Sequence, residues 1–223
     1  ASREYGAFLI GGDTNECADL VICCSVFGIG HEDKMVLRSG ARPGDILATT
    51  GDFGWTYVGL KALLEGLELE GPIRDRALRA VLMPEARLEA GVALAEAGVL
   101  TASIDSSDGL AWSLHELSRA SGVGFLVEEM PIPPELAEEA LRLGLDPIEA
   151  CFYGGEEYEL VLTVRPDAWE EAVEAASGAG VELKPIGRAV REPGLWLREP
   201  GGRLRPLEAR GWEHFGHQGA PGP

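Results

Sequence analysis

The residues best suited to chemistry lie in one short segment, Asp105-Ser-Ser-Asp-Gly109, between an expected apolar strand and an expected amphipathic helix. Two carboxylates three residues apart, with hydroxyls between them, can hold magnesium through hard oxygen ligands. The same residues can instead serve the helix, with Ser107 or Asp108 as its N-cap and Asp105 favouring its positive end. The two interpretations are compatible, because helix N-termini also bind phosphate, and the motif alone favours neither.

A second acidic segment, Gly154-Gly-Glu-Glu-Tyr-Glu-Leu160, places three carboxylates within four residues. A strand is expected to begin here, and its alternation sends Glu157 and Glu159 to one side and Tyr158 to the other. Glu156 directly follows a glycine pair, so it is free to face a cleft. For Glu157 and Glu159 we favour a solvated, acidic start of the strand.

Near the N-terminus, Gly11-Gly-Asp-Thr14 combines two glycines, which let a backbone approach a ligand closely, with a carboxylate that can hold a hard cation. A hairpin turn with Asp13 as its polar residue explains the same pattern, and this motif alone favours the turn. Arg38 and Arg42 are close enough in sequence to clamp a phosphate together. The alternative is surface arginine, which we favour for Arg42.

Trp212, in Gly211-Trp-Glu-His-Phe215, offers an aromatic face that can stack on a flat heterocycle or simply dock the end of the chain. The four histidines have no Cys or His partner at metal-binding spacing, which favours structural roles. Cys23 and Cys24 lie in an apolar run and are expected in the core. The four cysteines form no Cys-x-x-Cys pair, which indicates a reducing, cytoplasmic environment.

The charge balance excludes several classes of partner. The 223 residues carry 19 basic and 37 acidic side chains, a formal net charge of −18. A bare acidic surface repels nucleic acid and anionic lipid, so we expect neither as a partner. Phosphate ligands would require divalent cations to offset the repulsion. No apolar run reaches the ~18–20 residues of a membrane helix, so no membrane span is expected.

The elements that must position these residues mix strand and helix irregularly, which predicts an α+β fold rather than a doubly wound parallel sheet. Apolar, β-branched and alternating runs predict strands at 20–27, 46–50, 100–104, 123–127, 157–164, 181–184, 188–190, 195–198 and 203–206. Helical spacing with proline and glycine boundaries predicts helices at 55–65, 74–82, 85–97, 110–121, 134–143 and 169–176.

A glycine- and proline-containing connection around Gly40 and Gly44 divides the chain into residues 1–43 and an α+β domain at 44–223. The strand expected at Leu20–Phe27 is apolar on both faces, so it should need cover from other sequence or from a partner chain. We therefore expect this part of the protein to take part in a dimer.

Five motifs, in this order along nearly the whole chain, are similar to those of the thiamine-monophosphate kinase family. This family belongs to the aminoimidazole-ribonucleotide-synthetase-like ATP-binding superfamily. The motifs are Gly11–Thr14, Leu37–Asp45, Ile104–Leu110, Gly154–Leu160 and Gly211–Phe215. Each is weak alone, whereas the ordered set is specific.

The resemblance implies the C-terminal α+β domain of that fold (44–223), preceded by the last part of its N-terminal ATP-binding and dimerisation domain with a linker (1–43). Most of the N-terminal domain is then lacking. The chain departs from the family at Glu157, where Asp is common, and at Gly54-Trp-Thr-Tyr57, where the family has a different stretch of small residues.

The resemblance also implies ATP-dependent, Mg²⁺-assisted phosphorylation of thiamine monophosphate to thiamine diphosphate by direct in-line transfer, in a homodimer. The acceptor is already a phosphate anion, so positioning and charge screening matter more than a strong general base. The implied roles are catalysis and metal binding at Asp13 and Asp105, metal binding at Asp108, ATP binding at Gly12, Asp13, Arg38 and Ser107, and substrate binding at Glu156 and Trp212.

Two alternatives stay open at this point. The chain could belong to another ATP-dependent synthetase of the superfamily, such as aminoimidazole-ribonucleotide or selenophosphate synthetase, although the reactive Cys or selenocysteine in a glycine-rich N-terminal tail is absent here. It could also be a non-catalytic, ATP-binding or dimer-forming relative, because the family's first aspartate cluster lies outside this sequence.

Overall fold

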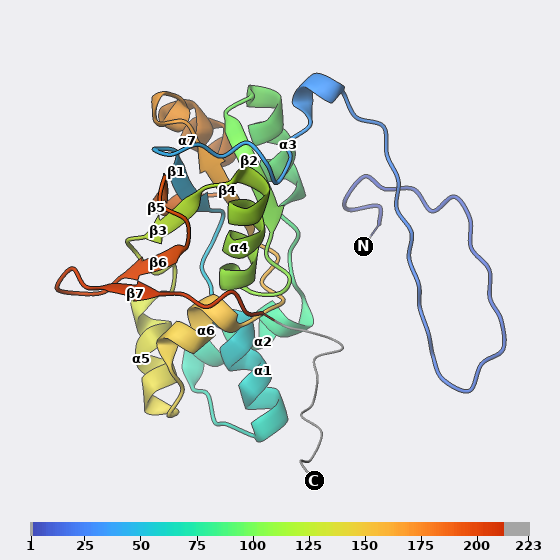
Figure 1. The fold of residues 1–223 in the computed structure, drawn as a ribbon. Helices are drawn as coiled ribbons and strands as arrows, with labels where there is room; N and C mark the ends of the chain where they lie inside the picture. Colours follow the sequence, from blue (N-terminus) through green and yellow to red (C-terminus); the bar gives the residue numbers. More distant parts are fainter. Residues whose placement is uncertain (1, 212–223) are drawn as a thin grey trace, which may run out of the picture. The chain divides into compact units, whose positions relative to one another are not determined.

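The computed structural model describes residues 2–211, and its internal contacts divide the chain into two units, residues 1–35 and 36–223 (Figure 1). In its described part, the first unit has a single regular element, the 3₁₀ helix η1 (Glu32–Lys34). All the other helices and strands described below belong to the second unit.

The strand expected at Leu20–Phe27 is not formed, and its side chains are exposed; Leu20, for example, is 90% exposed. Cys23 and Cys24 are also exposed, so the expectation that they lie in a core was wrong. A strand that is apolar on both faces needs hydrogen-bonding neighbours and cover. The described residues of the first unit contain no second strand that could supply them.

The second unit is built on one mixed sheet. Its seven strands lie in the order β2-β4-β1-β5-β3-β6-β7, and every neighbouring pair is antiparallel except β3 with β6. This confirms the prediction of an α+β fold. The strands are β1 (Ile46–Thr49), β2 (Leu100–Asp105), β3 (Gly124–Val127), β4 (Leu160–Val164), β5 (Lys184–Val190), β6 (Leu195–Arg198) and β7 (Leu204–Pro206).

Seven α-helices accompany the sheet in the described residues (Figure 1). They are α1 (Trp55–Glu65), α2 (Gly71–Leu82), α3 (Leu88–Ala97), α4 (Leu110–Ser121), α5 (Pro134–Arg142), α6 (Pro147–Tyr153) and α7 (Trp169–Gly178), with a 3₁₀ turn η2 (Pro166–Ala168) before α7. Over residues 2–211, none of these helices is long and apolar enough to cross a membrane.

Alternation along the strands divides the core between the two faces of the sheet. On β1, Leu47 joins the cluster that includes Leu114 of α4, whereas Ala48 joins the cluster that includes Leu94 of α3 and Ala172 of α7. Helix α4 therefore covers one face, and α3 with α7 covers the other. A third apolar cluster holds α1, α2, α5 and α6 together at one end of the unit (Figure 1).

Two elements differ from the expected pattern. Of the strands expected at 181–184 and 188–190, the first contributes only Lys184 and the second all its residues to the single strand β5, which continues through Pro185. Proline is tolerated there because Pro185 lies at a register shift opposite Ala48, where the ladder is interrupted. The short helix α6 was not expected, although Asp146 caps it by accepting a hydrogen bond from the Ile148 N–H (2.8 Å).

Candidate functional site

The sheet brings the two acidic segments together. Strand β2 is antiparallel to β4, with Asp105 at the end of β2 paired with Leu160 at the start of β4. The segment that leaves β2 therefore lies beside the segment that enters β4, although about 50 residues separate them in sequence.

Backbone hydrogen bonds join these two segments beyond the ends of their strands. The N–H of Ser106 donates to the carbonyl of Glu159 (2.9 Å), the N–H of Tyr158 to the carbonyl of Ser106 (2.9 Å), and the N–H of Glu156 to the carbonyl of Ser107 (2.7 Å). A Cβ added at Gly155 would lie 2.7 Å from the Ser107 carbonyl oxygen. Only glycine therefore fits this close approach.

A cavity of about 180 Å³ opens beside the β2–α4 segment. Its lining includes Arg38, Asp105, Ser107, Asp108 and Glu116. Among residues 2–211, no hydrogen bond or ion pair engages the carboxylate of Asp105 or Asp108. The Arg38 side chain is 57% exposed and lies 3.8 Å from Glu116, a distance at which the guanidinium can still bind a ligand.

The helix-capping alternative for this segment is not realised. The N-cap of α4 is Gly109, with φ 105°, and no side chain accepts a hydrogen bond at the cap. Ser107 and Asp108 are therefore not used as N-cap acceptors. The structure thus brings together Asp105, Ser107, Asp108 and Arg38 from the predicted set, and leaves their polar groups facing one cavity.

Glu156 and Tyr158 are joined by backbone hydrogen bonds to Ser107 and Ser106, which lie between Asp105 and Asp108 in the sequence. Both have left-handed backbone conformations, with φ 68° at Glu156 and φ 54° at Tyr158. Such conformations cost roughly 1–3 kcal/mol each in a residue with a side chain, and they persist only where the surroundings impose them. Here the hydrogen bonds to Ser106 and Ser107 impose them.

The Tyr158 hydroxyl donates a hydrogen bond to Glu156 Oε2 (2.8 Å). This bond, burial and the nearby carboxylates of Glu156, Asp105 and Asp108 raise the pKa of Tyr158 to about 12. Tyr158 is thus a site residue that the sequence reasoning missed. The available signal was the alternation that separates it from Glu157 and Glu159.

The preference for solvated Glu157 and Glu159 was wrong, because both side chains are buried. Glu157 Oε1 accepts hydrogen bonds from the backbone N–H groups of Gly54 (2.7 Å) and Thr56 (3.2 Å) at the start of α1. Burial raises the pKa of Glu157 to about 7, against the lowering effect of its bonds to Thr56 and Gly54. A carboxylate at this helix start satisfies N–H groups that have no partner within the helix.

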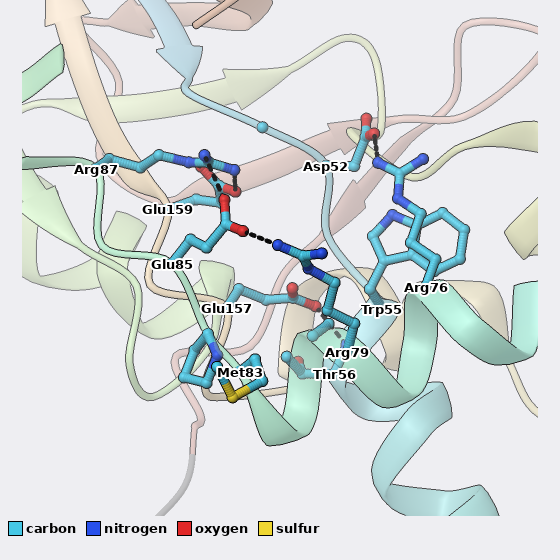
Figure 2. A pocket seen from close by; sticks show the side chains of 13 residues that line it. Asp52, Trp55, Thr56, Arg76, Arg79, Met83, Glu85, Arg87, Glu157 and Glu159 are labelled. Atoms are coloured by element: carbon cyan, nitrogen blue, oxygen red, sulfur yellow. Dashed lines mark hydrogen bonds and ion pairs between the residues drawn. The ribbon is translucent and has the colours of Figure 1, made fainter. Parts of the chain in front are cut away.

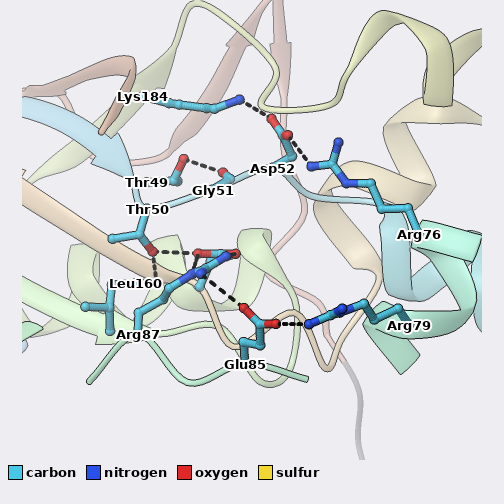
Figure 3. Close-up of polar contacts among 11 residues, drawn as sticks. Thr49, Thr50, Gly51, Asp52, Arg76, Arg79, Glu85, Arg87, Leu160 and Lys184 are labelled. Carbon is cyan, nitrogen blue, oxygen red and sulfur yellow. Dashed lines mark hydrogen bonds and ion pairs between the residues drawn. The ribbon is translucent and has the colours of Figure 1, made fainter. Parts of the chain in front are cut away.

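Glu159 is held by a partly buried ion pair. Arg87 donates from Nε to Oε2 (2.8 Å) and from Nη2 to Oε1 (2.6 Å) (Figure 2), while the Thr50 hydroxyl donates to Oε2 (2.7 Å). Glu85 lies between Arg87 and Arg79 and continues the chain of charges towards solvent (Figure 3). The local fold therefore uses the carboxylate of Glu159 for structure.

Glu157 and Glu159 line a second cavity of about 210 Å³ between α1, α2 and the start of β4 (Figure 2). Its charged side chains are largely paired with each other, Arg76 with Asp52 (3.1 Å) and Arg79 with Glu85 (2.7 Å) among them. The predicted separation of sides therefore holds, with Tyr158 directed to Glu156 and the two other glutamates directed here. Residues 156–159 already pair with Ser106 and Ser107 through backbone hydrogen bonds, although the regular strand β4 begins only at Leu160.

The remaining predicted positions are less informative. In the first unit, Asp13 accepts hydrogen bonds from the Thr14 N–H (2.9 Å) and the Asn15 side chain (3.1 Å), as in a polar turn, and Gly12 is exposed. Arg42 contributes its backbone N–H to Asp45 (2.9 Å) and does not line the Arg38 cavity. Trp212 lies outside the described residues.

The donor set suits magnesium better than a transition metal. Over residues 2–211 there is no cluster of three or more His, Cys, Asp or Glu side chains that could hold a metal. Magnesium, however, is commonly held by one or two carboxylates, with water and substrate phosphates completing its shell. The unengaged carboxylates of Asp105 and Asp108 fit that requirement.

Comparison with known proteins defines the class. The model of the AIR synthase related protein, C-terminal domain, matches residues 42–198, which is most of the chain, so the chain belongs to the AIR synthase related family. Within this family, it is similar to thiamine-monophosphate kinases.

One such kinase, from Pyrococcus abyssi, is 33% identical over 96% of this chain and 63% of its own length. Another, from Nitrosopumilus maritimus, is 33% identical over 96% of this chain and 67% of its own length. The structure of AaThiL complexed with AMPPCP and TMP superposes with a TM-score of 0.66 at 30% identity, covering 81% of this chain and 54% of AaThiL. The chain therefore spans about two thirds or less of the relatives that it matches.

Proposed function

We propose that this chain is part of an enzyme that uses ATP to phosphorylate thiamine monophosphate to thiamine diphosphate. The observation that carries the proposal is the pairing of two motifs at one edge of the sheet. Asp105, Ser107 and Asp108 face a cavity that Arg38 also lines, and Glu156 is tied by its backbone to Ser107. The relatives named thiamine-monophosphate kinase, and the complex of AaThiL with AMPPCP and TMP, support this choice of substrates.

In the proposed reaction, the chain's main task is to bring two phosphate-bearing molecules together. An acidic protein repels both of them, so cationic groups must offset the charge at the site. Arg38 supplies one such group, and its guanidinium suits the oxygen atoms of a phosphate. Ser107 supplies a hydroxyl that can hydrogen-bond a phosphate oxygen.

Asp105 and Asp108 are the residues that would hold Mg²⁺ in this unit, and Asp13 is assigned the same role by resemblance. Bound magnesium would supply positive charge to neutralise the phosphates of ATP and of the acceptor. Because the acceptor phosphate is already ionised, no residue needs to remove a proton from it. Asp105 and Asp13 therefore act through charge and position during direct in-line transfer, while Gly12 lets the backbone come close to ATP.

Glu156 is proposed to bind the thiamine part of the acceptor, with a carboxylate oxygen accepting a hydrogen bond from the amino-pyrimidine. Trp212 is proposed to stack on its ring system. We further propose that the enzyme is a cytoplasmic homodimer, as in the family that the motifs resemble.

Product analysis tests the proposal directly. The protein made from its complete gene is incubated with ATP, Mg²⁺ and thiamine monophosphate, and the products are separated by chromatography. We expect thiamine diphosphate and ADP in equal amounts. ATP turnover without thiamine diphosphate would favour another synthetase of the superfamily, and no turnover would favour a non-catalytic relative.

Arg38 and Arg42 provide a matched pair for this assay. Arg38→Ala should raise the KM for ATP by about tenfold or more, because a guanidinium–phosphate contact contributes at least ~1.4 kcal/mol. Arg42→Ala removes the same charge four residues away, outside the cavity, and should leave the KM for ATP unchanged. Equal effects of the two changes would argue against a specific role for Arg38.

A further inference from the structure

The contact between Tyr158 and Glu156 has no evident structural purpose in the fold. The Glu156 side chain is exposed, and within residues 2–211 its carboxylate has one hydrogen-bond partner, the Tyr158 hydroxyl, 2.8 Å from Oε2. Buried glutamates in the same segment have structural partners instead: Glu157 has the start of α1 and Glu159 has Arg87. A half-buried phenol that restrains an exposed carboxylate points to a ligand for that carboxylate.

The backbone is arranged so that this contact can form. Glu156 and Tyr158 both have positive φ, 68° and 54°, and the residue between them has its side chain buried on the opposite side. In a regular strand, Glu156 and Tyr158 would be directed to the same face but along an extended backbone. The left-handed conformations instead let the phenol of Tyr158 reach the Glu156 carboxylate. These conformations cost energy, and the backbone hydrogen bonds to Ser106 and Ser107 hold them in place.

The phenol is also within electrostatic range of the two aspartates proposed to hold Mg²⁺. The charges of Asp105 and Asp108 act on the Tyr158 hydroxyl in addition to the Glu156 carboxylate that accepts its hydrogen bond. Such surroundings disfavour the tyrosinate, and the hydroxyl remains a donor throughout the neutral pH range. Glu156 Oε2 is then occupied by the phenol, whereas Oε1 is left to accept a hydrogen bond from a ligand.

We propose that Tyr158 is a positioning residue that fixes the carboxylate of Glu156, beside the Asp105–Asp108 pair, in the orientation that receives the acceptor substrate. This inference rests on the proposed function and deepens it. An exposed glutamate has several rotatable bonds, and ordering them only on binding would weaken the complex. The phenol orders the carboxylate in advance, as a supporting residue for a contact group does.

Kinetics of Tyr158→Phe test the proposal, because this change removes the hydroxyl and keeps the ring. We expect the KM for thiamine monophosphate to rise about 3- to 30-fold, the loss of one hydrogen bond to a charged group, while the KM for ATP stays within about twofold. Tyr57→Phe is the matched control. It removes a hydroxyl from α1 but keeps the Cβ and ring atoms that pack against Gly154, so both constants should be unchanged.

A double-variant cycle separates positioning from a direct contact. If Tyr158 acts through Glu156, Tyr158→Phe should change the KM for thiamine monophosphate by less than about twofold in a Glu156→Ala background. Additive losses, equal losses for ATP and thiamine monophosphate, or an unchanged KM in Tyr158→Phe would each overturn the proposal. A fall in thermal stability with both KM values unchanged would also overturn it, since that result assigns the hydroxyl a structural role.

Tyrosine ionisation gives a readout that does not depend on the substrate. In an alkaline absorbance titration, the signal assigned to Tyr158 by its loss in Tyr158→Phe should ionise above the ordinary value of about 10. The Glu156→Ala variant should lower that ionisation pH, because its largest cause is the hydrogen bond to Glu156. An elevated, Glu156-dependent ionisation in a protein that does not phosphorylate thiamine monophosphate would refute the proposed function while retaining the contact. An ionisation unaffected by Glu156→Ala would refute the contact itself.

Discussion

Removing Arg87 should destabilise the protein far more than removing Arg79, an exposed arginine in the same chain of ion pairs. Glu159 is buried, with 6% of its surface exposed, and three hydrogen bonds hold its carboxylate. Arg87→Met takes away two of the three and the compensating charge, and leaves only the Thr50 hydroxyl. A charge left unpaired in the interior costs about 3–5 kcal/mol.

Partial solvent access reduces this figure. The Arg87 side chain is 28% exposed, so water can reach the place that its guanidinium leaves, and the Thr50 bond is retained. We therefore expect a loss of about 2–4 kcal/mol in the free energy of unfolding, somewhat less than for a fully buried pair. For a protein of this size, the melting temperature should fall by roughly 4–16 °C.

Denaturant unfolding at pH 7.5 measures the effect, and Arg79→Met provides the matched control. Arg79 pairs with Glu85 at 2.7 Å, but the two side chains are 71% and 56% exposed. Exposed pairs contribute about 0–1 kcal/mol, so this variant should be nearly as stable as the parent protein. Adding Glu159→Gln to Arg87→Met should restore part of the loss, because it removes the unpaired charge. Equal losses for the two arginines, or no recovery in the double variant, would refute the reasoning.

Three further predictions concern the site and its supports. Asp105→Asn and Asp13→Asn should each abolish phosphoryl transfer with little change in the denaturation midpoint, because each removes a charged oxygen ligand but keeps the shape; retained turnover would remove the metal assignment. The pKa of Glu157, raised to about 7 from its ordinary 4.5, means that the folded state holds this proton more tightly, so this group's contribution to stability should fall as pH rises from about 4.5 to 7. Glu157→Gln should remove that part of the slope in denaturation experiments between those pH values, and an unchanged slope would contradict the assignment. Trp212→Ala should raise the KM for thiamine monophosphate very roughly 3- to 30-fold and hardly change that for ATP, whereas a loss of thermal stability with both constants unchanged would assign the residue to docking of the tail.

Sequence patterns located most elements of the second unit because local signals and tertiary structure agree there. Helix α1 begins after Gly54 and ends before Gly66, as expected, since both glycines have the left-handed conformation that other residues avoid. The strand at 20–27 shows the opposite case. Its composition predicts burial, but burial requires neighbouring strands, and composition cannot show whether they are present.

The candidate site was predictable as a set of residue types but not as an arrangement. The carboxylates and hydroxyls of the motif around Asp105 are close together in sequence, so they can be recognised as a set. The structure places them in the lining of one cavity together with Arg38. The roles of the three glutamates, however, depend on partners far along the chain. Arg87 is 72 residues from Glu159, and Gly54 is 103 residues from Glu157.

The segment from Glu156 to Tyr158 shows why local rules fail where a site is built. Residue composition favours an extended strand from Glu157, and positive φ at a glutamate or a tyrosine is locally unfavourable. The backbone bonds to Ser106 and Ser107 override that preference and hold both residues in the left-handed conformation. The same bonds fix where the Glu156 carboxylate lies relative to Asp105 and Asp108. A strained backbone and a positioned carboxylate thus have one cause, and it lies in the pairing of β2 with β4 rather than in either motif alone.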